Sequence, residues 1–205
     1  MIIPELGAAR TDPEVWVRTL ATIDGLSVAD PVLRVAALMV PVAQTEGVPT
    51  VLSLLHRLRF SKAEAERIGG CIAPPWELPV DHEDAVGPRR WAAAAKPEHR
   101  RSRLRLALAS ARATHVHDAV VGPTVTAVRQ IRAEMRSGHA LSLGDLSVGG
   151  KDLIRLGMKP GPAMGDVLEA LLEDVLVDPT LNERETLLEL AKQAIDRIGV
   201  EGKTP

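Results

Sequence analysis

Apolar residues recur at intervals of three and four positions along almost the whole chain, and no sustained alternation of apolar and polar residues interrupts them. Capping acids next to prolines, as in Asp12-Pro13 and Asp30-Pro31, are typical of helix starts. The pattern therefore predicts an all-α protein. We expect an irregular multi-helix bundle that ends in a helix-turn-helix, or helical hairpin, tail.

The predicted helices differ in how clearly their limits can be placed. In the first, Val15, Leu20 and Ile23 form the expected buried stripe. Pro41 should kink or end the second, because proline lacks an N–H and clashes with the preceding turn. A capping box of Ser61 and Glu64 starts another helix. This helix is expected over residues 61–69. The other helices are expected over residues 50–59, 98–112, 124–136 and 182–195.

The strongest local signal lies between residues 148 and 172. A short helix ends at Gly157, which is expected to adopt a left-handed conformation, and Lys159-Pro-Gly-Pro162 supplies a tight turn into the next helix. Backbone N–H groups at a helix start with a nearby lysine can bind an anion. From spacing alone, an ordinary connection between two helices remains the simpler interpretation.

Charge is nearly balanced over the chain, with 25 basic and 27 acidic residues, but it is unevenly distributed. Residues 89–112 contain eight basic side chains and one acid, whereas residues 164–190 contain eight acids and one arginine. Either the two regions are solvated faces that attract each other, or the basic face follows phosphates. Aromatic residues are scarce, so we expect any RNA to be bound by backbone and shape rather than by base stacking.

A single cysteine, Cys71, excludes an intrachain disulfide and a multi-cysteine zinc site. Between Gly70 and Ile72 it is predicted to be a small buried residue. No apolar stretch is long enough to span a bilayer, and no secretory signal is recognisable. We therefore expect a cytoplasmic protein that does not enter a membrane.

Two acidic and histidine-containing segments are candidate metal sites. His115, His117 and Asp118 include a His-Asp pair of the kind used by HD-type phosphohydrolases, although helix capping or solvent exposure is the simpler interpretation. Asp81 and Asp84 lie in a carboxylate-rich run, but no strand or glycine-rich phosphate loop accompanies them. We interpret that run as a loop or a helix start.

The run from Gly150 to Glu173, followed by Asn182-Glu-Arg-Glu185, resembles the C-terminal tail of bacterial class II tRNA nucleotidyltransferases, the CCA-adding enzymes and their poly(A) polymerase relatives. Weaker similarity extends to residues 31–39 and 58–68. The resemblance implies a degenerate HD-like helical body over residues 1–115 and a tail over residues 116–205. Val40-Pro41 stands where many relatives have His-Asp, so metal-dependent hydrolysis is not expected there.

The resemblance also implies a function. The family's catalytic motifs have no counterpart in the sequence, so the chain is not expected to be active by itself and needs no cofactor of its own. Mg²⁺ and ATP or CTP would belong to a separate catalytic head, which is a candidate partner. The implied role is binding tRNA or other structured RNA in support of CCA addition or RNA 3′-end processing. The expected RNA-binding residues are Lys151, Arg155, Lys159, Gly161, Arg100, Arg101, Arg103 and Arg105.

Two other functions stay open at this point. One is a diverged HD-type metal phosphohydrolase that uses His115, His117 and Asp118. The other is a helical protein-interaction module with no RNA role, in which the basic and acidic faces bind partners or each other.

Overall fold

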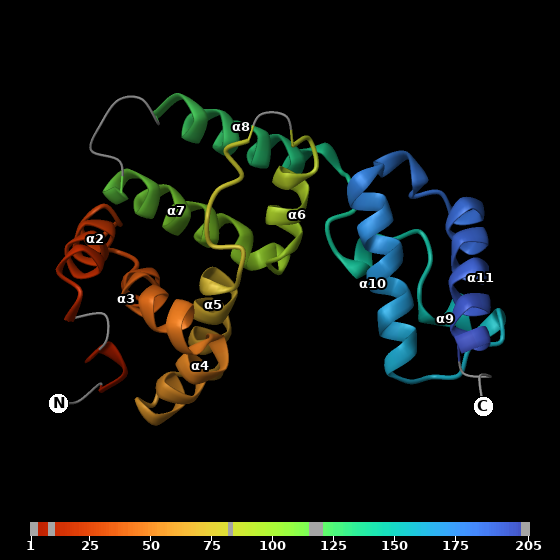
Figure 1. Cartoon of the computed structure of the whole chain (residues 1–205), viewed down its shortest axis with the longest axis horizontal. Helices are drawn as coiled ribbons and strands as arrows, with labels where there is room; N and C mark the ends of the chain where they lie inside the picture. Colours follow the sequence, from red (N-terminus) through yellow and green to blue (C-terminus); the bar gives the residue numbers. More distant parts are fainter. Residues whose placement is uncertain (1–3, 8–10, 82–83, 115–120, 202–205) are drawn as a thin grey trace. The chain divides into compact units, whose positions relative to one another are not determined.

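The computed structural model describes residues 4–7, 11–81, 84–114 and 121–201. Every regular element in this part of the chain is a helix, which confirms the predicted all-α fold (Figure 1). The chain divides into two compact units, Met1–Arg132 and Ala133–Pro205. The functional division expected after residue 115 adjoins residues 115–120, which lie outside the described residues, and it stays a prediction.

The first unit is a bundle built around α3. Helix α3 packs against α2, α4, α5 and α7, and α7 also packs against α2 and α5. Leu33, Met39, Leu54, Leu55 and Ile68 are among the side chains buried in its core. Its elements are η1 (Pro4–Leu6), α2 (Pro13–Asp24), α3 (Pro31–Glu46), α4 (Val48–Arg57), α5 (Lys62–Ile72), α6 (Gly87–Ala93), α7 (Pro97–Thr114) and most of α8 (Val121–Ser137).

Three predicted helix starts in the first unit, at Asp12, Asp30 and Ser61, are confirmed by their capping bonds. The Asp12 carboxylate accepts from two N–H groups of the first turn of α2, and the Asp30 carboxylate accepts from one N–H group of α3, that of Leu33. In the capping box of α5, the Ser61 N–H donates to Glu64 Oε2 at 2.9 Å and the Glu64 N–H donates to Ser61 Oγ at 3.3 Å. Helix α5 continues to Ile72, beyond the expected end at residue 69.

One expectation about the buried face of α2 is wrong. Leu20 is 43% exposed, whereas Thr19 and Thr22 are buried. Their hydroxyls donate to the carbonyls of Val15 and Arg18 at 2.7 and 2.8 Å. These bonds within the helix satisfy the hydroxyl donors, so threonine can face the interior at low cost.

Helix α3 does not end at Pro41, contrary to one of the two outcomes expected there. It continues to Glu46, with Pro41 buried inside it. The carbonyl of Pro41 accepts a hydrogen bond from the Thr45 hydroxyl at 3.0 Å. The helix stops at Gly47, which directly precedes α4 and has a φ of +87°, a conformation that favours glycine.

Cys71 is buried, as predicted. Burial raises the pKa of its thiol to about 11, so the group is neutral and unreactive near pH 7. No helix among the described residues is long and apolar enough to cross a membrane. No group of three or more His, Cys, Asp or Glu side chains there could hold a metal ion.

The second unit contains the predicted helical hairpin. Its helix α10 packs against both α9 and α11. Leu153, Val167, Leu171, Val175 and Leu187 are buried between these helices. After the end of α8, the elements are η3 (Leu143–Asp145), α9 (Gly150–Arg155), α10 (Pro162–Val177), η4 (Pro179–Leu181) and α11 (Arg184–Glu201).

Candidate nucleic-acid interface

The turn between α9 and α10 begins with a left-handed glycine. Gly157 has φ of +93°, and its N–H donates to the Ile154 carbonyl at 2.9 Å. The next N–H, that of Met158, donates to the Leu153 carbonyl at 3.0 Å. These bonds satisfy carbonyls that the end of a helix otherwise leaves unpaired. The predicted closure of α9 at Gly157 is thereby confirmed.

The start of α10 presents backbone donors to solvent. Pro162 is its first residue, as predicted, and Gly161 precedes it in an extended conformation. Within the described part of the chain, the N–H groups of Lys159 and Gly161 have no acceptor. A Cβ placed on Gly161 would meet nothing within 4 Å, so the approach to this backbone is open. The positive end of the α10 dipole lies at the same place, which favours an anion.

Three basic side chains accompany these donors. Lys151, Arg155 and Lys159 are all exposed, as is Gly161. Lys151 and Arg155 lie four positions apart on α9 and therefore share one face of that helix. The four predicted residues of this unit thus lie exposed within one short segment of the chain, residues 151–161. Their role as RNA contacts remains a prediction.

This segment also contains a buried carboxylate. Asp152 is 8% exposed, and its Oδ2 accepts from the Gly149 N–H at 3.0 Å, which caps α9. Its Oδ1 accepts from Arg155 Nη1 at 3.0 Å and from Arg184 Nη2 at 2.5 Å. The hydrogen bond from Arg184, supported by the Gly149 N–H and by the charges of both arginines, holds the pKa of Asp152 below its usual value. Asp152 is therefore charged near neutral pH.

The start of α11 is tied to the same segment. The Ser147 N–H donates to Asn182 Oδ1 at 2.9 Å, and Asn182 Nδ2 donates to the Asp145 carbonyl at 3.1 Å. Arg184 Nη1 donates to the Ser147 carbonyl at 3.1 Å while its Nη2 holds Asp152. We call Asp145, Ser147, Asp152, Asn182 and Arg184 the clamp.

The clamp was not predicted from the sequence. Asn182 was expected to begin the last helix, whereas in the structure its side chain bridges to residues 145 and 147. One signal was available: Asp152 is the only acid in the basic run from Lys151 to Lys159, and an unmatched acid there suggests a specific partner.

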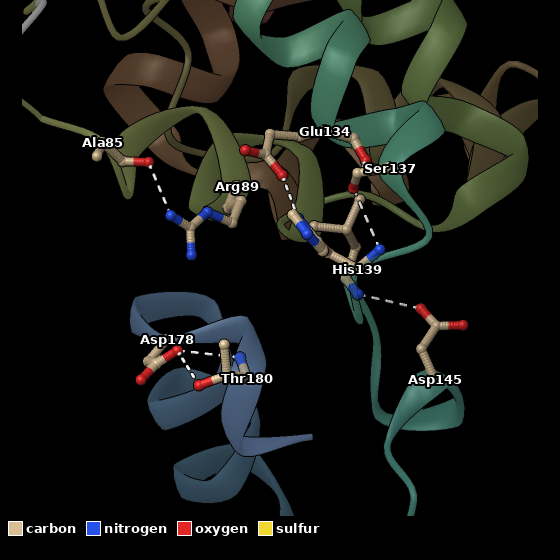
Figure 2. A network of polar contacts seen from close by, with 9 residues as sticks. Ala85, Arg89, Glu134, Ser137, His139, Asp145, Asp178 and Thr180 are labelled. Carbon is tan, nitrogen blue, oxygen red and sulfur yellow. Dashed lines mark hydrogen bonds and ion pairs between the residues drawn. The ribbon is translucent and has the colours of Figure 1, made fainter. Parts of the chain in front are cut away.

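The connection from α8 to the clamp is held by local polar contacts, which are shown in Figure 2. His139 Nδ1 lies 2.8 Å from Glu134 Oε2, and the His139 N–H donates to Ser137 Oγ at 3.1 Å. Asp145 Oδ2 accepts from the Leu141 N–H at 3.1 Å. The segment that leads into α9 therefore has a defined path.

The four predicted arginines of α7, in the first unit, lie on different sides of that helix. Arg101 and Arg105 are exposed one turn apart, whereas Arg100 and Arg103 are buried. Arg100 Nε donates to the Ala92 carbonyl at 3.0 Å, and Arg103 stacks over the Trp91 ring. Spacing alone did not show that Arg100 and Arg103 are buried. Arg100 and Arg103 have internal partners and therefore do not belong to the exposed basic surface.

The candidate metal-binding residues form no metal site in the part of the chain that the structure describes. His115, His117 and Asp118 lie outside the described residues. Asp84 accepts from the Val86 and Gly87 N–H groups at 3.0 and 2.8 Å. It therefore shapes the start of α6, in agreement with the loop or helix start expected for this run.

Comparison with known proteins supports a relationship for the C-terminal part. The model of the family described as "tRNA nucleotidyltransferase domain 2 putative" matches residues 115–191. Over 52 residues the chain is 42% identical to the CCA-adding enzyme of Limosilactobacillus fermentum (strain NBRC 3956 / LMG 18251). The matched segment covers 25% of this chain and 13% of that enzyme. No solved structure matches the chain significantly. Residues 115–191 are therefore similar to a domain of tRNA nucleotidyltransferases, which confirms the resemblance first seen in the run from Gly150.

Proposed function

We propose that the second unit binds the backbone of tRNA, or of another structured RNA, in support of CCA addition or RNA 3′-end processing. The observation that carries the proposal is the open turn before α10, with unpaired N–H groups and three exposed basic side chains, inside the segment that matches the tRNA nucleotidyltransferase domain. Catalysis and its Mg²⁺ and nucleotide would be supplied by a separate head.

The charge distribution of the second unit limits where RNA could bind. The α10 and α11 surfaces carry exposed acids, which repel phosphates. Lys151, Arg155 and Lys159 lie on α9 and in the turn, where the backbone donors are. Contacts to phosphate and ribose at this position would read the shape of an A-form helix rather than its base sequence. The exposed pair Arg101 and Arg105 on α7 is a second candidate contact, in the first unit.

The proposal is tested by fluorescence anisotropy with labelled tRNA and with duplex DNA of the same length. We expect tighter binding to tRNA and a steep loss of affinity with salt, because each neutralised phosphate releases counterions. Lys151→Glu and Lys159→Glu should each weaken binding and lower the salt slope by about 1. The matched control is Lys192→Glu, an exposed lysine on α11, which should change affinity little.

Two results would overturn the proposal. One is equal affinity of the unaltered protein for tRNA and DNA with a shallow salt slope. The other is equal weakening by Lys159→Glu and by Lys192→Glu, which would indicate only a general effect of net charge.

A further inference from the structure

The first unit contains a cavity of about 410 Å³. It is lined by residues of α2, α3 and α7, by Cys71 of α5, by the segment from Trp76 to Val80, and by Thr124 of α8. All of these residues lie in the same compact unit. The volume falls within the range of small-molecule sites, about 300–1,000 Å³.

A buried arginine lines this cavity. Arg103 is 2% exposed, and its Nη2 donates to the Pro75 carbonyl while its guanidinium lies 4.6 Å from the centroid of the Trp91 ring. Its Nη1 is buried and has no hydrogen-bond partner. Among the described residues no carboxylate pairs with this guanidinium.

Such a group is costly for the folded protein, because a buried charge is normally paired and a buried donor is normally bonded. Burial lowers the pKa of Arg103 to about 10, so the side chain still carries its charge at neutral pH. The stacking on Trp91 and the bond to Pro75 offset only part of the cost and leave one end of the guanidinium fork unused.

The remaining lining residues favour an anion with an apolar body. Arg18 also lines the cavity, and Glu77 is the one acid among the lining residues, so basic side chains outnumber acidic ones. Val40 and Leu106 contribute apolar wall, and Ala107 leaves room where a larger side chain would fill it.

We propose that this cavity binds a small organic anion, with a carboxylate or phosphate group on the Arg103 guanidinium and an apolar part against Val40, Leu106 and Ala107. An oxyanion would supply the acceptor that Nη1 lacks and the counter-charge that the interior lacks. This site is separate from the turn before α10 and does not depend on RNA binding.

The test uses the full chain with benzoate and phenyl phosphate as anionic probes and benzamide as a neutral probe of similar shape. Binding is followed by calorimetry and by tryptophan fluorescence, because Trp76 lines the cavity and Trp91 contacts Arg103. We expect at least one anion to bind, at least tenfold more tightly than benzamide. A preference between the two anions identifies whether carboxylate or phosphate is the natural head group.

Variants then locate the site. Arg103→Met keeps much of the side-chain volume but removes the charge, and Ala107→Leu fills the cavity while Arg103 remains. Both should weaken anion binding at least tenfold. Arg129→Met, at an exposed arginine of α8 in the same unit but outside the cavity, should leave anion binding unchanged.

Failure of both anions to bind the unaltered protein would overturn the proposal, as would binding that Ala107→Leu leaves intact. If Arg103→Met fails to fold, Ala107→Leu and Arg103→Lys decide, because the lysine keeps the charge but loses the fork and should bind the anion more weakly.

Discussion

Gly157 is the residue whose backbone conformation determines where α9 stops. Its φ of +93° strains any residue with a Cβ, although a Cβ there would meet nothing within 4 Å. Gly157→Ala should therefore cost about 1 kcal/mol of unfolding free energy from conformation alone. This change in unfolding free energy can be measured by urea unfolding followed by circular dichroism. Gly161→Ala is the matched control, since Gly161 is extended and equally open; equal stability of the two variants would contradict the prediction.

Asp152 should make the second unit sensitive to acid. Its pKa is lower in the folded protein than in the unfolded chain, so the unfolded chain binds more protons as the pH falls. The stabilisation is present above about pH 4, the ordinary value for Asp, and is lost as the pH falls through the lower folded value. Asp152→Asn should flatten that part of the dependence.

Melting temperatures measured between about pH 6 and pH 2 give the comparison. Asp166→Asn, which changes an exposed acid on α10, should keep the steeper acid dependence of the unaltered protein. If the melting-temperature curve of Asp152→Asn is parallel to that of Asp166→Asn, the contact between Asp152 and Arg184 contributes nothing to stability in solution.

At the scale of elements, α9 is too short to be stable by itself. It has six residues, and isolated helices need about 12–15 residues to form in water. Its position depends on the cap from Asp152 and on the bonds from Asn182 and Arg184. The basic side chains proposed to bind RNA are therefore held by residues more than twenty positions away.

Loss of one clamp bond should loosen this arrangement. Asn182→Ala removes the acceptor of the Ser147 N–H and the donor to the Asp145 carbonyl, at a cost of about 1–2 kcal/mol. Hydrogen exchange of the Ser147 amide should become faster. Exchange in α4, which belongs to the first unit, serves as the internal control and should not change. An unchanged exchange rate of the Ser147 amide would show that the Asn182 side chain does not stabilise this segment.

For the whole molecule, each unit has a core of its own. All three tryptophans, Trp16, Trp76 and Trp91, belong to the first unit, so their fluorescence reports on that unit alone. Leu171→Ala opens a cavity in the second core and should cost about 2–5 kcal/mol there. We expect the circular dichroism transition to begin at lower urea while the tryptophan transition stays in place. A matching shift in both signals would show that the units unfold together.

Local rules were enough to predict much of the fold. Capping at Asp12, Asp30 and Ser61, the left-handed Gly157 and the start at Pro162 all depend on neighbouring residues, and all are confirmed. Properties that depend on distant partners were not predictable in this way.

The failures have specific physical causes. Thr19 and Thr22 are buried because their hydroxyls bond within α2, which a hydrophobic pattern does not register. Arg103 appeared to belong to a solvated basic face, but its place in the interior depends on Trp91 and Pro75. The clamp joins residues about 35 positions apart, and no helical period predicts that pairing.

The clamp also limits the length of α10. This helix leads away from the turn, and the chain must deliver both Asn182 and Arg184 to residues 145–152 after it. One inserted turn of four residues would displace the end of α10 by about 6 Å, which is more than a hydrogen bond can stretch. The chain should therefore tolerate insertions in exposed loops of the first unit far more readily than insertions in α10.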